Sequence, residues 1–226
     1  FCAGKKFEKE YKSFNIIKTH SWDFNEKLKT NFNKVKLKNY FLYFDQYEHN
    51  HPDYLYFKRD TIDPVPFYKS LNSFFLFLEK KYKMNVIIAA HPKAPVSYYK
   101  KYFKKRKFYF NKTLELTKNC FATLIHDTTA VSYSVIYEKP TIFLINNEMI
   151  RVRKNRKKII EIFSRALGSS FINIDKRDDL LKIKNNIKAI NKNRYKNYFK
   201  NYILNSKKNK NKKIETLVCN KYLNIN

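Results

Sequence analysis

The chain has 226 residues, of which 43% are hydrophobic, so it can bury a sizeable core. No apolar run reaches the roughly 18 residues needed to cross a bilayer, which argues against a membrane-spanning class. None resembles a secretory signal either, but a piece of a longer protein would lack one in any case. The three cysteines are far apart with no C-x-x-C spacing, which argues against a zinc or redox motif and fits a reducing compartment. The formal net charge of +29 fits a nucleic-acid partner, attraction to anionic lipid or a phosphorylated substrate, or a composition rich in Lys and Asn throughout. Because lysine is spread over every segment, we favour composition.

The first 39 residues are polar and aromatic without a clear period. We predict that 1–39 are a linker or the end of a preceding domain, and a start at Phe1 rather than Met leads us to expect a piece of a longer protein. A strand over 40–45 then ends on Asp45. Residues 46–66 follow as a loop, and loops of this length in a compact domain are usually functional or disordered.

The loop after Asp45 is rich in histidine and acid. His49, His51 and Asp53 are metal-ligand types, but their spacing is no zinc signature, so we expect no metal. We expect His51 to contact a sugar or nucleotide instead, together with Asp45. Solvated side chains are the expectation for Glu48 and His49.

Apolar runs and helical periods alternate over the rest of the chain. From Pro66 a helix is predicted, with Phe67, Leu71, Phe74, Phe75, Leu78 and Tyr82 on one face. The strand 86–90 stops on His91-Pro92, and the strand 121–126 stops on His126. A helix over 128–139 would have Asp127 or Thr128 as its N-cap. The remaining predictions are a helix over 96–105, a strand over 107–110, a helix over 112–119, a strand over 141–145, a basic helix over 147–167 with Gly168 as C-cap, a strand over 171–174, a helix over 176–190, and a further helix with a basic tail over 191–226.

This alternation predicts an α/β fold with a Rossmann-like parallel sheet flanked by helices, the domain running over 40–190. Ligands of such sheets bind beyond the carboxyl ends of the strands, where Asp45, His91 and His126 fall. Two glycines in the chain exclude a Walker loop and a G-x-G-x-x-G loop. A phosphate would therefore be held by other groups. Thr128 and Thr129 at a helix start are candidates, and ordinary capping is the alternative.

His91 can donate to a phosphate oxygen or act as an acid on a leaving group, and Pro92 restrains it to an extended conformation. A histidine satisfied by backbone groups is the alternative, for His126 as well. No G-x-S-x-G elbow is present, and no Ser/His/Asp set can be assigned.

Three stretches resemble a set of bacterial surface-polysaccharide proteins that look like the C-terminal half of GT-B glycosyltransferases: "YFDQYEHNHPDYLYF", "YKSLNSFFLFLEKKYKMNVIIAAHPK" and "KTLELTKNCFATLIHDTTAVSYSVIYEKPTIFL". The His-Pro pair and the later hydroxyl pair are similar to the pattern of bacterial sialyltransferases and polysialyltransferases. The resemblance implies that His91 with Pro92, and Thr128 with Thr129, hold the phosphate and nucleotide of a CMP-activated sugar. We add the adjacent Lys93 to this binding set. The acidic general-base motif of that family is absent, and Asp45 is not an equivalent, so the base would lie on a preceding domain or be supplied differently.

The leading hypothesis is a glycosyltransferase-like domain for capsule or lipopolysaccharide synthesis, with His91 as the catalytic residue. Its partners would be a nucleotide-sugar donor and a polysaccharide or lipid-linked acceptor, without a cofactor. A CDP-linked polyol-phosphate transferase and a non-catalytic basic protein for nucleic acid or anionic membrane are the alternatives. We expect a cytoplasmic protein that can lie at the inner face of the membrane, and no specific nucleic acid.

Overall fold

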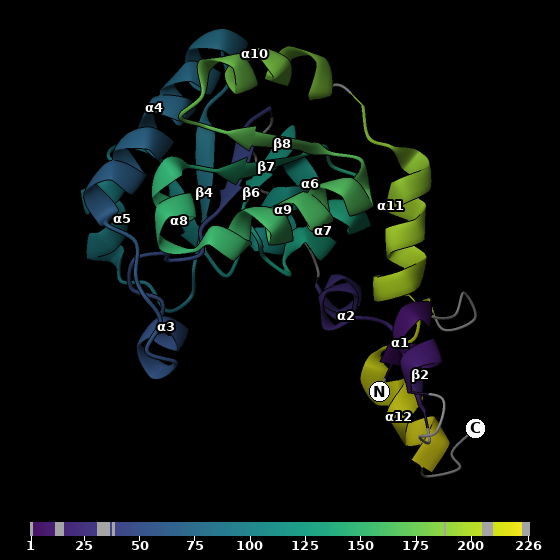
Figure 1. The fold of residues 1–226 in the computed structure, drawn as a ribbon. Coiled ribbons are helices and arrows are strands. Elements are labelled where there is room, and N and C mark those ends of the chain that lie inside the picture. The colour runs from purple at the N-terminus through teal and green to yellow at the C-terminus, as the bar shows by residue number, and fades with distance from the viewer. Residues whose placement is uncertain are drawn as a thin grey trace.

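A six-stranded parallel sheet forms the centre of the molecule (Figure 1), in the order β5-β4-β3-β6-β7-β8. The computed structural model describes residues 2–11, 16–30, 37, 39–187, 189–204 and 210–222. The strands are β3 (Phe41–Phe44), β4 (Val86–Ala90), β5 (Phe108–Phe110), β6 (Ala122–Ile125), β7 (Thr141–Ile145) and β8 (Ser170–Asn173). The predicted α/β, Rossmann-like class is confirmed.

The four central strands are buried along their whole length, which explains their composition. Every residue of β3, β4, β6 and β7 is buried, so both faces of the sheet select apolar side chains. β3 lies between β4 and β6, with Phe41 paired with Val86 on one side and Ala122 on the other. The four strands are therefore parallel neighbours, in agreement with the predicted parallel sheet.

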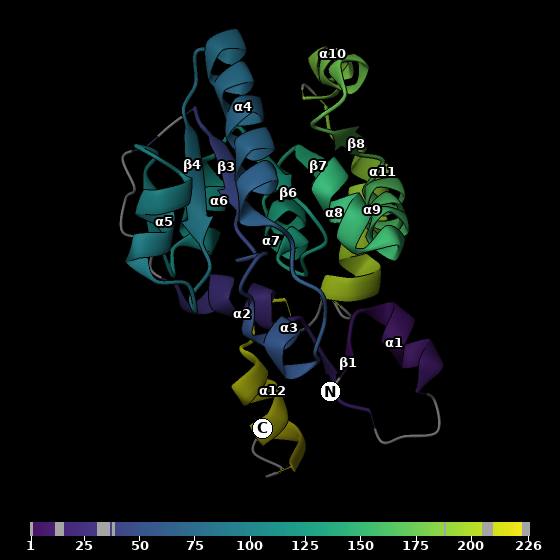
Figure 2. The same cartoon turned by 60° about the vertical axis from the view of Figure 1, so that its left-hand side comes forward.

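Helices cover both faces of the sheet. In Figure 2, α4 (Pro64–Tyr82) lies in front of the strands, and α6 (Thr113–Asn119) and α7 (Val131–Ile136) lie behind them. α4 begins where Asp63 Oδ1 accepts a hydrogen bond from the Val65 N–H, at 2.9 Å, which satisfies one free donor of the first turn. The face predicted for this helix is the buried one, from Phe67 to Leu78. The other helices around the sheet are α3 (Pro52–Tyr56), α5 (Val96–Tyr102), α8 (Asn147–Val152), α9 (Lys154–Leu167) and α10 (Arg177–Asn186).

Several helices differ from the predicted ones in their bounds; α4, for example, begins at Pro64 rather than Pro66. The basic helix expected over 147–167 is interrupted at Arg153, whose backbone leaves the helical region with φ −138° and ψ 83°. The helix expected from Thr128 begins only at Val131. The long loop after β3 contains the short helix α3. Gly168 does end α9, with φ 62° in the left-handed region that favours glycine.

The first and last described elements of the chain lie together beside the sheet (Figure 1). The Ser21 N–H donates to the Ile203 carbonyl at 2.7 Å, and the Tyr133 hydroxyl donates to Glu26 Oε2 at 2.6 Å. The terminal elements are β1 (Cys2–Ala3), α1 (Lys5–Glu10), β2 (Lys18–Thr19), α2 (Trp22–Lys29), α11 (Lys192–Tyr198), the π-helical η1 (Phe199–Ile203) and α12 (Ile214–Tyr222). The predicted boundaries at 39 and 190 stay predictions. Of the predicted basic tail, 210–213 are exposed, and 205–209 lie outside the described residues.

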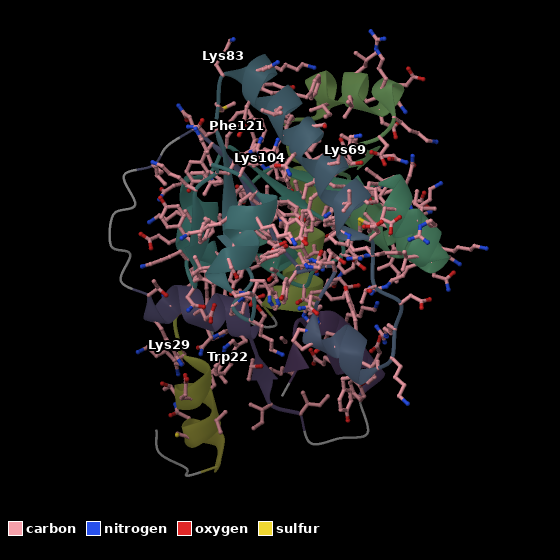
Figure 3. All side chains as sticks on the ribbon, turned by 90° about the vertical axis from the view of Figure 1, so that its left-hand side faces the viewer. Trp22, Lys29, Lys69, Lys83, Lys104 and Phe121 are labelled. Carbon is pink, nitrogen blue, oxygen red and sulfur yellow. The ribbon has the colours of Figure 1, made fainter. Side chains whose placement is uncertain are left out.

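Basic side chains are spread over the surface. Figure 3 shows Lys29, Lys69, Lys83 and Lys104 on separate parts of the molecule, and all four are exposed. This spread agrees with composition as the source of the net charge. Among the described helices, none is long and apolar enough to cross a membrane.

Candidate functional site

A cavity of about 480 Å³ lies at the carboxyl edge of the sheet, where β3, β4 and β6 end. Counted from β3, the strand order of the sheet is 3-2-1-4-5-6, the order of dinucleotide-binding folds. In that order, β4 and β5 are added on one side of β3, and the chain then crosses to add β6, β7 and β8 on the other side. The cavity therefore lies at the switch point, where open α/β sheets bind their ligands.

Most of the predicted binding residues meet in this cavity. Two of the predicted residues, Lys93 and His126, do not line it. Those that do are Asp45, His51, His91, Pro92, Thr128 and Thr129.

His126 is a structural residue in this fold. It is fully buried, its Nδ1–H donates to the Leu144 carbonyl at 2.7 Å, and its Nε2 accepts from the Tyr43 hydroxyl at 3.0 Å. Burial lowers its pKa, so the ring is neutral. Since both nitrogens are used, the expected ligand contact is wrong for His126, which instead links β6 to β3 and β7.

Lys93 is exposed and lies outside the cavity lining. Only its backbone takes part in the site, because the Lys93 N–H contacts His91 Nδ1 at 3.3 Å. Its expected place in the binding set is therefore not supported by its position.

The two threonines occupy a turn rather than the start of a helix. Thr128 Oγ1 accepts from the Ala130 N–H at 3.2 Å, and Ala130 stands at the N-cap of α7 without a side-chain cap. Within the described part of the chain, the Thr129 hydroxyl makes no hydrogen bond. Asp127 does not cap α7 either, because it binds Arg156. The predicted start of the helix at Thr128 is therefore wrong. The turn presents two threonine hydroxyls to a ligand instead.

Asp45 forms part of the cavity wall and is held by tyrosines. Tyr98 and Tyr99 donate to its two carboxylate oxygens at 2.9 and 2.8 Å. Burial raises the pKa of Asp45 to about 7, against the opposing effect of these hydrogen bonds. The Tyr99 hydroxyl also accepts from the His91 N–H at 2.6 Å, so the ends of β3 and β4 are fixed to each other.

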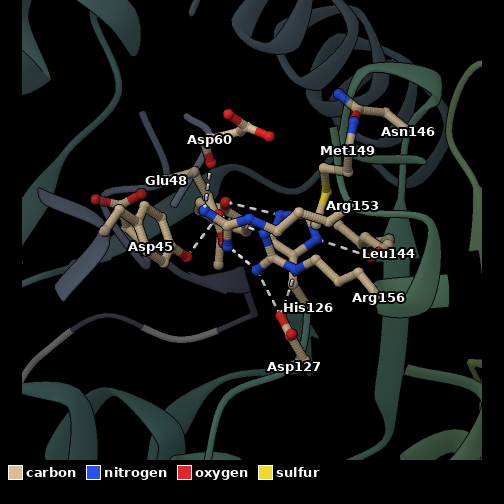
Figure 4. Close-up of polar contacts among 12 residues, drawn as sticks. Asp45, Glu48, Asp60, His126, Asp127, Leu144, Asn146, Met149, Arg153 and Arg156 are labelled. Carbon is tan, nitrogen blue, oxygen red and sulfur yellow. Dashed lines mark hydrogen bonds and ion pairs between the residues drawn. The ribbon is translucent and has the colours of Figure 1, made fainter. Parts of the chain in front are cut away.

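A buried arginine joins the two loops that border the cavity (Figure 4). Arg156, in the first turn of α9, is 3% exposed and donates to both carboxylate oxygens of Glu48, which is fully buried. The Arg156 Nε also donates to Asp127 Oδ1 at 2.8 Å. Burial alone would raise the pKa of Glu48, but the charge and hydrogen bonds of Arg156 bring it below its ordinary value. The expectation of a solvated Glu48 is therefore wrong.

Arg153, at the break between α8 and α9, lies against the wall formed by α3. Its guanidinium carbon is 3.6 Å from the centre of the Tyr54 ring, and its Nη2 donates to the Asp60 carbonyl at 3.0 Å. The cavity lining then contains three acids and three arginines, so it is formally neutral despite the +29 of the chain. These six residues are Asp45, Asp53, Asp127, Arg59, Arg153 and Arg156.

The histidines of the long loop separate in the structure. His51 lines the cavity, whereas His49 packs on Tyr98 with ring centres 5.4 Å apart and contacts the Tyr68 hydroxyl through Nδ1 at 3.2 Å. Over the residues that the structure describes, no group of three or more His, Cys, Asp and Glu side chains is placed to hold a metal ion.

Comparisons with known proteins give a distant structural neighbour. No family model and no curated protein matches the chain. Among solved structures, it is similar to the UDP-GlcNAc 2-epimerase of Methanocaldococcus jannaschii in complex with UDP-GlcNAc and UDP, with a TM-score of 0.44 and 16% identity. The match covers 75% of this chain and 42% of the epimerase chain. A similarity at this level identifies neither a ligand nor a reaction, so both are inferred below from the residues of the cavity.

Sequence reasoning missed Glu48, Arg153 and Arg156. Glu48 and Arg156 are 108 residues apart, so no local pattern relates them. One compositional signal was available: only eight of the 48 basic residues are arginines, and three of those eight line the cavity. Arginine binds carboxylates in a fixed fork that lysine cannot reproduce, so a rare arginine in a lysine-rich chain indicates a buried ion pair.

We expect Arg156→Ala to lower the free energy of unfolding by roughly 3–5 kcal/mol, because Glu48 would remain buried without the cation that balances its charge. Urea denaturation followed by circular dichroism measures this. Arg151→Ala is the matched control, since Arg151 pairs with Glu148 through a side chain that is 66% exposed and should cost little. Adding Glu48→Gln to Arg156→Ala should recover part of the loss. If Arg156→Ala and Arg151→Ala lowered the free energy of unfolding equally, the buried ion pair would not have the structural role assigned to it.

The stability of the protein should depend on pH through Asp45. Its pKa is about 7 in the fold against 3.8 ordinarily, so the folded state keeps a proton that the unfolded chain has lost between these values. The free energy of unfolding, taken relative to that of Asp45→Asn, should therefore fall as pH rises from about 4 to about 7. The fall should be at most about 1.4 kcal/mol per pH unit, and the difference should level off above about pH 7. Unfolding of both proteins across this range measures the difference, in which the histidine contributions largely cancel. Parallel pH profiles would show that Asp45 has no raised pKa.

Proposed function

We propose that the cavity binds the phosphate of a nucleotide-activated sugar and that the chain is a glycosyltransferase-like domain. The observation that carries this proposal is the meeting of His91, Thr128 and Thr129 in one cavity at the switch point of the sheet. The volume of about 480 Å³ falls in the range of small-molecule sites, roughly 300–1,000 Å³.

The chemistry of the cavity suits a phosphate. The His91 Nδ1 accepts from its own loop, which leaves the Nε2–H of the neutral ring to donate to a ligand. The hydroxyl of Thr129 is free within the described chain, and that of Thr128 still has its proton to donate. Such fixed donors would stabilise the charge that develops on a departing nucleotide phosphate.

The proposed reaction is a direct displacement at the anomeric carbon of the sugar. An acceptor oxygen forms the new bond, the bond from this carbon to the phosphate oxygen breaks, and its electron pair leaves with the nucleotide. His91 and the two threonines would hold that phosphate. The acceptor hydroxyl passes its proton to a base, which would lie on a preceding domain or be supplied differently.

A CMP-linked donor is favoured, and its support is the resemblance of the His91-Pro92 and Thr128-Thr129 motifs. The same resemblance supports capsule or lipopolysaccharide synthesis and a polysaccharide or lipid-linked acceptor. The positive charge of the chain is what supports a place at the inner face of the membrane. A CDP-linked polyol-phosphate transferase would use the same hydrogen-bond donors to hold its phosphate. Activity assays with both kinds of donor substrate are therefore needed to distinguish the two functions.

The alternative that this cavity binds a polyanion such as nucleic acid or an anionic membrane has less support. The positive charge of the protein lies on its outer surface, whereas the cavity lining balances three acids against three arginines. A nucleic-acid or lipid surface gains affinity from uncompensated positive charge, which this lining does not supply.

Titration calorimetry with CMP and CDP, against UDP and GDP, tests the proposal. We expect the cytidine nucleotides to bind, and His91→Ala to weaken their binding about tenfold or more, because a hydrogen bond to a charged group contributes roughly 1.5–3 kcal/mol. Thr129→Ala should weaken binding less, since other donors remain. Lys212→Ala, on the exposed tail, is the control and should change nothing at moderate salt.

The outcomes separate binding from stability. If His91→Ala and Thr129→Ala lowered the melting temperature and left nucleotide affinity unchanged, both residues would be structural. No nucleotide binding at millimolar concentration would reject the proposed function for this chain.

A further inference from the structure

Arg153 is fixed in the wall of the cavity by two contacts (Figure 4). Its guanidinium carbon lies 3.6 Å from the centre of the Tyr54 ring, and its Nη2 donates to the Asp60 carbonyl at 3.0 Å. Tyr54 is itself held in place, because its hydroxyl donates to Glu48 Oε2 at 3.2 Å. The guanidinium is therefore positioned before any ligand binds.

Most of the hydrogen-bonding capacity of this guanidinium is unused. Only one of its five N–H donors has an acceptor among the described residues, and its Nε is buried without a partner. Buried donors in native proteins nearly always have an acceptor, so the free Nε calls for an explanation. Nor does a carboxylate of the described chain pair with Arg153, in contrast to Arg156, which is balanced by Glu48 and Asp127. Arg153 can therefore donate to an anion that enters the cavity.

The groups already assigned to the phosphate are uncharged. Thr128 and Thr129 offer hydroxyls, and burial, with a smaller effect of His51, lowers the pKa of His91 to about 4, so its ring is neutral near pH 7. An ionised phosphate that leaves water for a cavity needs an opposite charge as well as hydrogen bonds. A hydrogen bond from a charged donor to a phosphate is also roughly twice as strong as one between neutral groups.

Among the arginines of the lining, Arg153 meets this need best. Arg59 also has no carboxylate partner within the described chain, but it is exposed, with its guanidinium 5.1 Å from the Phe57 ring, so salt and water screen its charge. Arg153 is half-buried and already oriented, and a planar fork that is oriented in advance loses less entropy for each hydrogen bond. The lining is neutral in sum, so one such guanidinium suits a single phosphate rather than a polyanion.

We propose that Arg153 binds the phosphate of the nucleotide through charge-assisted hydrogen bonds and supplies the cation that His91, Thr128 and Thr129 lack. This inference rests on the proposed function and adds the group that balances the phosphate charge. It makes Arg153 a specificity-determining residue, because a guanidinium distinguishes a nucleotide from the uncharged nucleoside. The same guanidinium would stabilise the charge that develops on the phosphate oxygen when the bond to the sugar breaks.

Calorimetric titration with CMP and with cytidine tests this inference. For Arg153→Gln we expect the CMP affinity to fall about tenfold or more and the preference for CMP over cytidine to fall with it. Arg153→Lys should recover only part of the loss, since an ammonium group keeps the charge but not the fork. Arg59→Gln is the matched control, because it also removes one positive charge from the lining and should weaken CMP binding clearly less.

A second measurement uses the unchanged protein and does not depend on the folding of a variant. Each of the eight arginines has one Nε–H group, which nitrogen-15 NMR can follow, with single Arg→Lys variants for assignment. The Arg153 signal should shift when CMP is added and should not shift with cytidine. The signal of Arg151, which pairs with Glu148 through an exposed side chain, should stay in place with both.

The outcomes separate this inference from the proposed function. If CMP bound and left the Arg153 signal in place, or if Arg153→Gln and Arg59→Gln weakened CMP binding equally, the inference would be overturned and the proposed function would stand. A lower melting temperature of Arg153→Gln with unchanged CMP affinity would overturn it too, because Arg153 would then only join α9 to the loop at Asp60. Absence of nucleotide binding to the unchanged protein would reject both.

Discussion

The ion pair between Arg156 and Glu48, buried beneath the cavity, fixes the geometry of the site. Moving these two charges out of water costs several kcal/mol for each ion, and the cost is offset only if every donor and acceptor finds a partner. Arg156 meets this condition by donating to Glu48 and to Asp127. Because Glu48 belongs to the loop after β3 and Asp127 to the loop after β6, a single guanidinium sets the distance between two walls of the cavity.

A second set of hydrogen bonds fixes the remaining wall. The Tyr98 hydroxyl donates to Asp45 and therefore accepts from Tyr68, at 2.6 Å. Tyr99 donates to the other oxygen of Asp45 and accepts from the backbone of His91. The carboxylate at the end of β3 thus positions the histidine at the end of β4. This carboxylate is buried and has a raised pKa, so the wall also contains a group that can exchange a proton at neutral pH.

Parts of this arrangement are readable from the sequence because they depend on local pattern. Unbroken apolar runs predict buried parallel strands, and the polar residue that ends each run predicts which edge holds the ligand. Asp45 and His91 were found in this way, whereas Thr128 was proposed as part of a helix start that α7 does not have. His126 shows the limit of the same rule: it also ends a strand, but its ring turns into the core to bond Tyr43 and Leu144.

The remaining features depend on contacts between distant segments. The burial of Glu48 and the break in the helix at Arg153 follow from how the loop after β3 meets α9, and no local pattern in either segment encodes that meeting. The late start of α7 has the same origin, because Asp127 is taken by Arg156 and cannot cap the helix. In each case a tertiary ion pair overrides a local preference.

The most direct measurement uses the five histidines of the chain. Their ring protons can be followed by NMR while CMP is added, with single His→Gln variants for assignment. If the switch-point cavity is the ligand site, the signals of His51 and His91 should shift, while those of His20, His49 and His126 should stay in place. CMP binding that leaves His51 and His91 unchanged, or that moves all five signals alike, would contradict a phosphate site in this cavity.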